Sequence, residues 1–127
     1  MLDYARRFHG LNSLTYVYRH GQTVRGPLLA LKYSLNKRRD SVRVAVVVSK
    51  KVDKSAVVRN RIRRRIYEVV RPLIAGVDQP YDLVFTAFSV QLVELETAKL
   101  QQLVAEQLTK AGITPPTKPK SRAIVNP

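Results

Sequence analysis

Cysteine is absent from the sequence. Its absence excludes disulfide bonds, a catalytic thiol and a zinc site with cysteine ligands. Long hydrophobic runs are also missing, because the longest, residues 44–48, has the length of a β-strand and is far too short to span a bilayer. Residues 1–10 are polar and carry Arg6, Arg7 and His9, so they contain no apolar signal-peptide core. We therefore expect a soluble, cytoplasmic protein that binds no membrane.

Side chains that could perform catalysis are sparse. A nuclease that acts alone usually needs two or more convergent carboxylates, or a pair of histidines. The two histidines, His9 and His20, have no carboxylate cluster near them in the sequence, and Asp78 and Asp82 are separated by Pro80. No glycine-rich loop for a nucleotide is present either. We expect no catalytic residue and no metal site in this chain.

Acidic residues are few compared with basic ones. The chain has 23 Lys and Arg against 9 Asp and Glu, a net charge of +14, and 45% of its 127 residues are hydrophobic. It can therefore bury one core, but this surplus of charge opposes compaction unless a polyanion such as nucleic acid binds. An anionic membrane would require a hydrophobic anchor, which the sequence lacks. We expect a single RNA-binding domain at residues 1–112 and a disordered basic tail at residues 113–127.

Hydrophobic spacing predicts the order of helices and strands. We expect a helix at residues 11–20, strands at 28–35, 42–49 and 81–87, a helix at 56–71 that ends before Pro72, and a long helix at 92–111. A further strand would complete the order α-β-β-β-α-β-α. This order predicts an α/β (α+β) two-layer sandwich, in which helices pack on a small mixed sheet.

Positive charge is concentrated around the middle helix. Residues 50–71 hold nine Lys and Arg against two acidic residues, a net +7. The spacing of Val58, Ile62, Ile66 and Val69 predicts that one side packs on the sheet. The opposite side carries Arg61, Arg64, Arg65 and Glu68, and it is flanked by Arg59, Asn60 and Arg63. A merely solvated face would mix charges, whereas arginine forks suit phosphate.

The same segment resembles a known family. Residues 49–52 (SKKV) and 56–65 (AVVRNRIRRR) resemble the Arg-Asn-Arg signature of the protein subunit of bacterial ribonuclease P. Residues 16–21, 43–49 and 81–85 fit the family as well, so the resemblance covers residues 6–110. It implies an α/β sandwich in which the signature helix forms a left-handed crossover between parallel strands, against the usual right-handed preference.

The resemblance also implies a function. In this family an RNA subunit carries the active site and its Mg²⁺ ions, while the protein binds that RNA and the 5′ leader of precursor tRNA. The complex hydrolyses one phosphodiester bond and leaves the mature tRNA 5′ end. The residues that match the RNA-subunit surface are Lys50, Lys51, Lys54, Arg59, Asn60, Arg61, Arg63, Arg64 and Arg65. Those assigned to the leader cleft between the first helix and the sheet are Leu14, Tyr18, Tyr33, Arg43 and Ser49.

Several alternatives stay open at this point. Lys32 could take the place of Tyr33 in the cleft, and Tyr18 and Tyr33 could be core residues instead. For Phe85 and Phe88 we expect core packing. A non-catalytic ribosomal-type RNA-binding protein is the alternative function. A DNA-binding factor is not expected, because no helix-turn-helix pairing precedes the arginine helix.

Overall fold

The computed structural model describes residues 11–38 and 41–113. Its elements are α1 (Leu11–His20), β1 (Gln22–Arg25), β2 (Leu29–Leu35), β3 (Arg43–Val48), α2 (Ala56–Ile74), β4 (Tyr81–Ala87), the 3-10 helix η2 (Val90–Val93) and α3 (Thr97–Lys110). The expected tail from residue 114 onward lies outside the described residues. Ile113, which we expected to be the first residue of that tail, is buried in the core. The domain therefore extends to residue 113, one residue beyond the predicted end.

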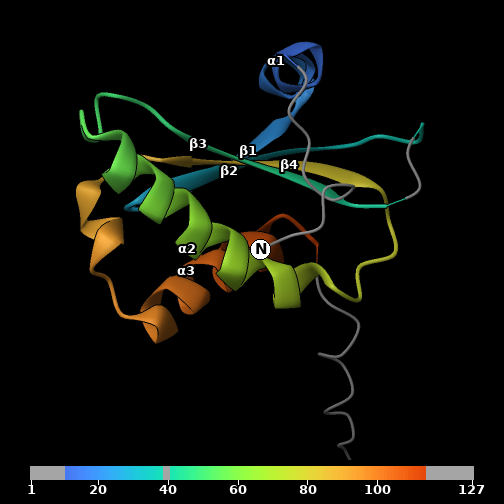
Figure 1. The fold of residues 1–127 in the computed structure, drawn as a ribbon. Helices are drawn as coiled ribbons and strands as arrows, with labels where there is room; N and C mark the ends of the chain where they lie inside the picture. Colours follow the sequence, from blue (N-terminus) through green and yellow to red (C-terminus); the bar gives the residue numbers. More distant parts are fainter. Residues whose placement is uncertain (1–10, 39–40, 114–127) are drawn as a thin grey trace, which may run out of the picture.

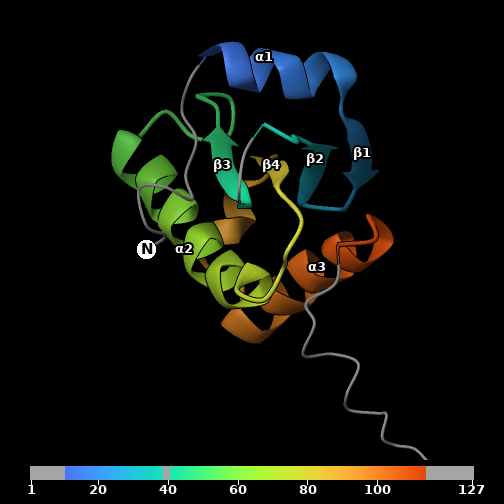
Figure 2. The same ribbon diagram turned by 90° about the vertical axis from the view of Figure 1, so that its right-hand side faces the viewer.

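The four strands form one mixed sheet in the order β1-β2-β4-β3. β2 pairs antiparallel with both β1 and β4, whereas β3 and β4 are parallel, with Val46 opposite Phe85. With the strands pointing up and α2 in front of the sheet, β4 lies to the left of β3 (Figures 1 and 2). The β3-α2-β4 crossover is therefore left-handed, as the resemblance implies. The predicted α+β fold with a small mixed sheet is confirmed, but its helices lie on both faces of the sheet and not in one layer.

The two faces of the sheet carry different layers. α2 and α3 cover one face, and α1 crosses the other (Figures 1 and 2). The main core lies under α2 and α3, where Ile62 and Ile66 pack with Leu31 and Phe85. The predicted apolar side of the basic helix is thus confirmed, and so is the buried position of Phe85.

α1 has a smaller core of its own. Its Val17 packs on Ala45 of β3 and Val84 of β4. Gly21 lets the chain turn from α1 directly into β1, because a Cβ at this position would lie 2.5 Å from the carbonyl oxygen of Val17. In the described parts of the chain, no helix is long and apolar enough to cross a membrane.

Three predictions about the elements are wrong. Pro72 does not end α2, which continues to the buried Ile74. A proline so near the C-terminus removes one backbone hydrogen bond, and the burial of Ile74 favours the last turn nonetheless. The single helix expected at 92–111 is in fact two helices, because residues 94–96 are not helical and separate η2 from α3. Phe88 lies at the surface, with 49% of its area exposed.

Candidate nucleic-acid interface

The loop between β3 and α2 is fixed by short-range hydrogen bonds. The Ser49 side chain accepts from the Lys51 backbone N–H (3.3 Å), and the Asp53 carboxylate accepts from that of Ser55 (2.8 Å). Ser55 caps α2, since its hydroxyl accepts from the Val58 N–H at 3.3 Å. These bonds give the loop a defined shape, and they leave the side chains of its lysines exposed.

The exposed cations of this region form a surface that we call the basic ridge. Its members are Lys50, Lys51, Lys54, Arg61 and Arg64. Within the described residues, none of these five side chains forms a hydrogen bond or an ion pair. The ridge therefore carries positive charge to which no acidic side chain of the described residues is bound, and it is the strongest candidate for a phosphate-binding surface.

Arg59 has a structural role, although it belongs to the family signature. Its Nη1 donates to the backbone carbonyl oxygens of Asp53 (3.0 Å) and Lys54 (2.9 Å). It therefore holds the loop against the first turn of α2. Asn60 and Arg63 are joined in a similar way, because the Arg63 Nη2 donates to the Asn60 side-chain oxygen. Asn60 is nevertheless exposed, beside the ridge.

Arg65 departs furthest from its predicted place. Its Nη1 donates to the carbonyl oxygens of Leu92 (2.6 Å) and Val93 (3.0 Å), and its Nη2 donates to the carbonyl of Leu95 and the hydroxyl of Thr97 (3.4 Å). Unlike Arg64, Arg65 thus has a structural role in the protein itself, and its contact with RNA stays a prediction. η2 lies beside the first half of α2 and covers this side of the helix (Figure 1). Arg65 instead satisfies the carbonyls where η2 leads into α3.

The second candidate surface lies where α1 crosses the sheet, which is the place of the predicted leader cleft. Tyr18, on α1, is 40% exposed, and the Lys32 Nζ lies 5.9 Å from the centre of its ring. Lys32 also donates to the hydroxyl of Thr23 on β1 at 3.1 Å. Leu14 is half-buried against the small core under α1. An exposed aromatic ring beside a lysine suits stacking of a base with a phosphate nearby.

Tyr33 does not line this cleft. It faces the α2 and α3 side of the sheet, where it packs against the main core and meets Tyr81 edge-to-face at 6.3 Å. Its hydroxyl donates to the Gln22 side chain (3.2 Å). Because neighbouring residues of a strand point to opposite faces, placing Leu31 in the core puts Lys32 in the cleft and Tyr33 away from it. The assignment of Tyr33 to the cleft is therefore wrong, and Lys32 takes that place.

Arg43 is on the cleft side of the sheet, but its guanidinium is bound to Asp82. The Nε donates to Oδ1 at 2.9 Å and the Nη2 to Oδ2 at 3.0 Å, and Asn36 adds a bond of 2.9 Å to Oδ2. The side chains of Arg43 and Asp82 are only 11% and 3% exposed. The ion pair links the parallel strands β3 and β4 and gives Arg43 a structural role, while its contact with a leader stays a prediction. No pattern in the sequence points to Asp82 as its partner.

These surfaces belong to a small basic α+β protein with a left-handed crossover and a ridge of exposed cations. The sequence model of the family described as Ribonuclease P matches residues 4–112. The ribonuclease P protein component of Roseiflexus castenholzii is 42% identical over 97 residues, which cover 76% of this chain and 78% of that protein. The component of Chloroflexus aurantiacus is 35% identical over 99 residues, covering 78% and 72%. The chain therefore belongs to the ribonuclease P protein family.

Solved structures agree on the fold. The RNase P protein of Staphylococcus aureus matches with a TM-score of 0.75 at 24% identity, over 86% of this chain and 97% of that chain. The protein of Thermotoga maritima matches with a TM-score of 0.72 at 16% identity, over 82% and 96%. The resemblance that the signature residues indicate is confirmed.

Substitution of the two neighbouring arginines by alanine should affect stability very differently. Arg65→Ala removes a charged donor from several backbone carbonyls, so we expect a loss of about 2–3 kcal/mol in the free energy of unfolding. Arg64→Ala removes an exposed side chain and should change it by less than about 0.5 kcal/mol. Urea unfolding followed by circular dichroism measures both. Equal stability of the two variants would contradict the role given to Arg65.

Proposed function

We propose that this protein binds the catalytic RNA subunit of ribonuclease P through the basic ridge and holds the 5′ leader of precursor tRNA in the cleft under α1. Its family membership makes the chain a protein component of ribonuclease P, which processes tRNA and works with an RNA subunit. The observation that carries the proposal is the ridge of Lys50, Lys51, Lys54, Arg61 and Arg64, whose charges no described residue neutralises. We place the complex in the cytoplasm.

The ridge is suited to RNA by its charge. Arg61 and Arg64 are one turn apart on α2, so their like charges repel by a few tenths of a kcal/mol in the free protein. RNA phosphates would remove this repulsion and release counterions, which favours binding. Each arginine fork can also donate hydrogen bonds to two phosphate oxygens at once. The loop lysines extend the same surface toward the carboxyl end of β3.

The cleft under α1 is suited to a single strand. Tyr18 offers a partly exposed ring, and Lys32 places a charge beside it. Stacking on an aromatic ring does not require a particular base, so the cleft would accept leaders of many sequences. A grip on the leader favours precursor over product, because mature tRNA has lost that segment.

We assign the chemistry to the RNA partner. Among residues 11–38 and 41–113, no group of three or more His, Cys, Asp or Glu could hold a metal ion. The side chains described here do not fit a Mg²⁺ site, and we propose that the Mg²⁺ needed for endonucleolytic hydrolysis is bound by RNA. The protein would assist by lowering the repulsion between two RNAs, which reduces the Mg²⁺ concentration that the reaction requires.

Arg64→Ala should weaken binding to the ribonuclease P RNA of a related bacterium. Loss of one phosphate contact should reduce the slope of log affinity against log salt by roughly one. Filter binding at several salt concentrations measures the slope. Lys110→Ala, at the end of α3, is the matched control and should leave the slope unchanged. An unaltered slope for Arg64→Ala would show that the ridge does not contact phosphate at this position.

Tyr18→Ala should reduce the affinity of the assembled complex for precursor tRNA by about five- to a hundredfold, because one stacked base contributes roughly 1–3 kcal/mol. Affinity for mature tRNA should not change. Tyr16→Ala is the control, since Tyr16 is an exposed tyrosine on α1 whose ring instead lies 4.5 Å from that of His20. The cleft assignment fails if Tyr18→Ala weakens the binding of both tRNAs equally.

A further inference from the structure

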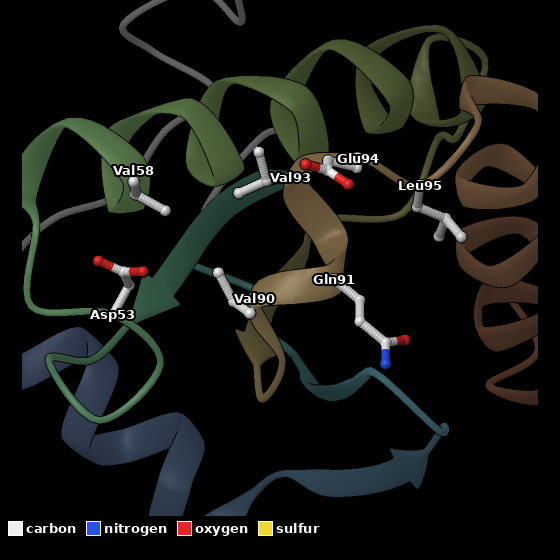
Figure 3. A pocket seen from close by; sticks show the side chains of 7 residues that line it. All are labelled: Asp53, Val58, Val90, Gln91, Val93, Glu94 and Leu95. Carbon is white, nitrogen blue, oxygen red and sulfur yellow. The ribbon is translucent and has the colours of Figure 1, made fainter.

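A groove beside the start of α2 belongs to neither of the two surfaces described above. It has a volume of about 520 Å³, within the range of small-ligand pockets, roughly 300–1,000 Å³. Figure 3 shows Val58 of α2 and Asp53 at one end, Val90 and Val93 of η2 in the middle, and Glu94 and Leu95 toward the other end. The groove lies where the parallel strands β3 and β4 both end and α2 begins.

The lining of the groove combines an apolar floor with free hydrogen-bond acceptors. Valines form most of the floor, and Val90 keeps 45% of its area exposed. The Asp53 Oδ1 accepts from the Ser55 N–H, whereas its Oδ2 has no partner in the part of the chain that the structure describes. The carboxylate of Glu94 has none there either. Uncovered carboxylates beside apolar surface suit a flat ligand that carries N–H donors.

The residues around the groove favour a nucleotide over a cationic peptide as its ligand. Lys54 follows Asp53 in the loop, and Arg61 is one turn beyond Val58 on α2, so the basic ridge borders the groove. A cationic peptide would suit the two carboxylates, but it would have to approach past the ridge. A nucleotide fits both parts of the site. Its anionic phosphates can lie on the basic ridge, and its neutral base can enter the groove beside the carboxylates.

We propose that the groove between Asp53, Val90 and Glu94 is a binding site for one unpaired nucleobase of an RNA whose phosphates lie on the basic ridge, and that it prefers guanine. Guanine presents two adjacent donors, N1–H and N2–H, on its Watson–Crick edge, which one carboxylate can accept together. The apolar floor contacts the face of the base. This inference rests on the proposed RNA-binding function and adds a base-specific contact to a surface that otherwise reads only phosphate.

The test compares the pentaribonucleotides UUGUU and UUUUU as probes of the full-length protein. Methyl NMR follows Val58, Val90, Val93 and Leu95, and the concentration dependence of the shifts gives the affinity. UUGUU should bind about tenfold more tightly than UUUUU, as expected for one bidentate base contact, and it should shift the groove methyls. Glu94→Gln, which keeps the shape and removes the charge, should reduce the preference to less than about threefold.

Two valine substitutions separate the groove from the ridge. Val90→Phe fills the groove and should abolish both the preference for UUGUU and the methyl shifts. Val57→Phe puts the same side chain on the exposed surface of α2, where Val57 is 68% exposed, and should keep both. Because both valines are exposed, neither change should prevent folding.

Other outcomes would overturn the proposal. Equal binding of the two RNAs, or shifts confined to α1 and β2, would show that the groove reads no base, while the proposed RNA-binding function would stand. Failure of both RNAs to bind would contradict that function as well. Tighter binding of the peptide acetyl-Lys-Ile-Val-Lys-amide in the groove would assign it to a protein partner instead.

Discussion

The burial of one side of α2 against the sheet determines where the charges of this protein lie. Ile62, Ile66 and Val70 have no exposed area, and together with residues of β2, β3 and β4 they form the main core. Because this packing fixes the rotation of α2 about its axis, it also fixes which arginines can reach solvent. The crossover between the parallel strands β3 and β4 then places the start of α2 next to the loop lysines. The position of the basic ridge therefore follows from the way α2 packs on the core.

The arginines of α2 fall into two groups that composition alone does not separate. Arg61 and Arg64 extend from the helix with no partner among the described residues, whereas Arg59 and Arg65 donate to backbone carbonyls of neighbouring segments. Arginine suits both tasks, because its several donors can satisfy several carbonyls at once. Arg59 and Arg65 hold the loop and η2 in place beside Arg61 and Arg64, so they support the same surface.

Much of this could be predicted from the sequence, and the errors have physical causes. The period of Val58, Ile62, Ile66 and Val69 was sufficient to place α2, since apolar spacing follows from burial. It could not place Arg65, because a helical pattern does not show that η2, about 27 residues later, packs beside it. For Tyr33, by contrast, the sequence pattern was sufficient and the family resemblance was misleading. The alternation of β2 put it with the core residues, and the resemblance alone assigned it to the cleft.

Contacts between distant segments account for the remaining differences. The buried pair of Arg43 and Asp82 joins residues 39 positions apart in the sequence, and only the parallel pairing of β3 with β4 brings them together. Each charge of the pair has the other as its partner, so the pair joins β3 to β4 on the face of the sheet under α1. Tyr18 and Lys32 meet in the same way, because α1 lies across β2. The cleft is therefore a product of tertiary structure, whereas the ridge is largely a property of one helix and its loop.

The most direct test of the central claim is the cleavage of a precursor tRNA by a bacterial ribonuclease P RNA at low millimolar Mg²⁺, with and without this protein. The account predicts release of the 5′ leader at the mature end only when the RNA and the protein are both present. It also predicts that the dependence on the protein fades as the Mg²⁺ concentration rises, because the added cations replace those of the ridge. Tight RNA binding without any stimulation would contradict the accessory role, and cleavage by the protein alone would contradict the assignment of the chemistry to RNA.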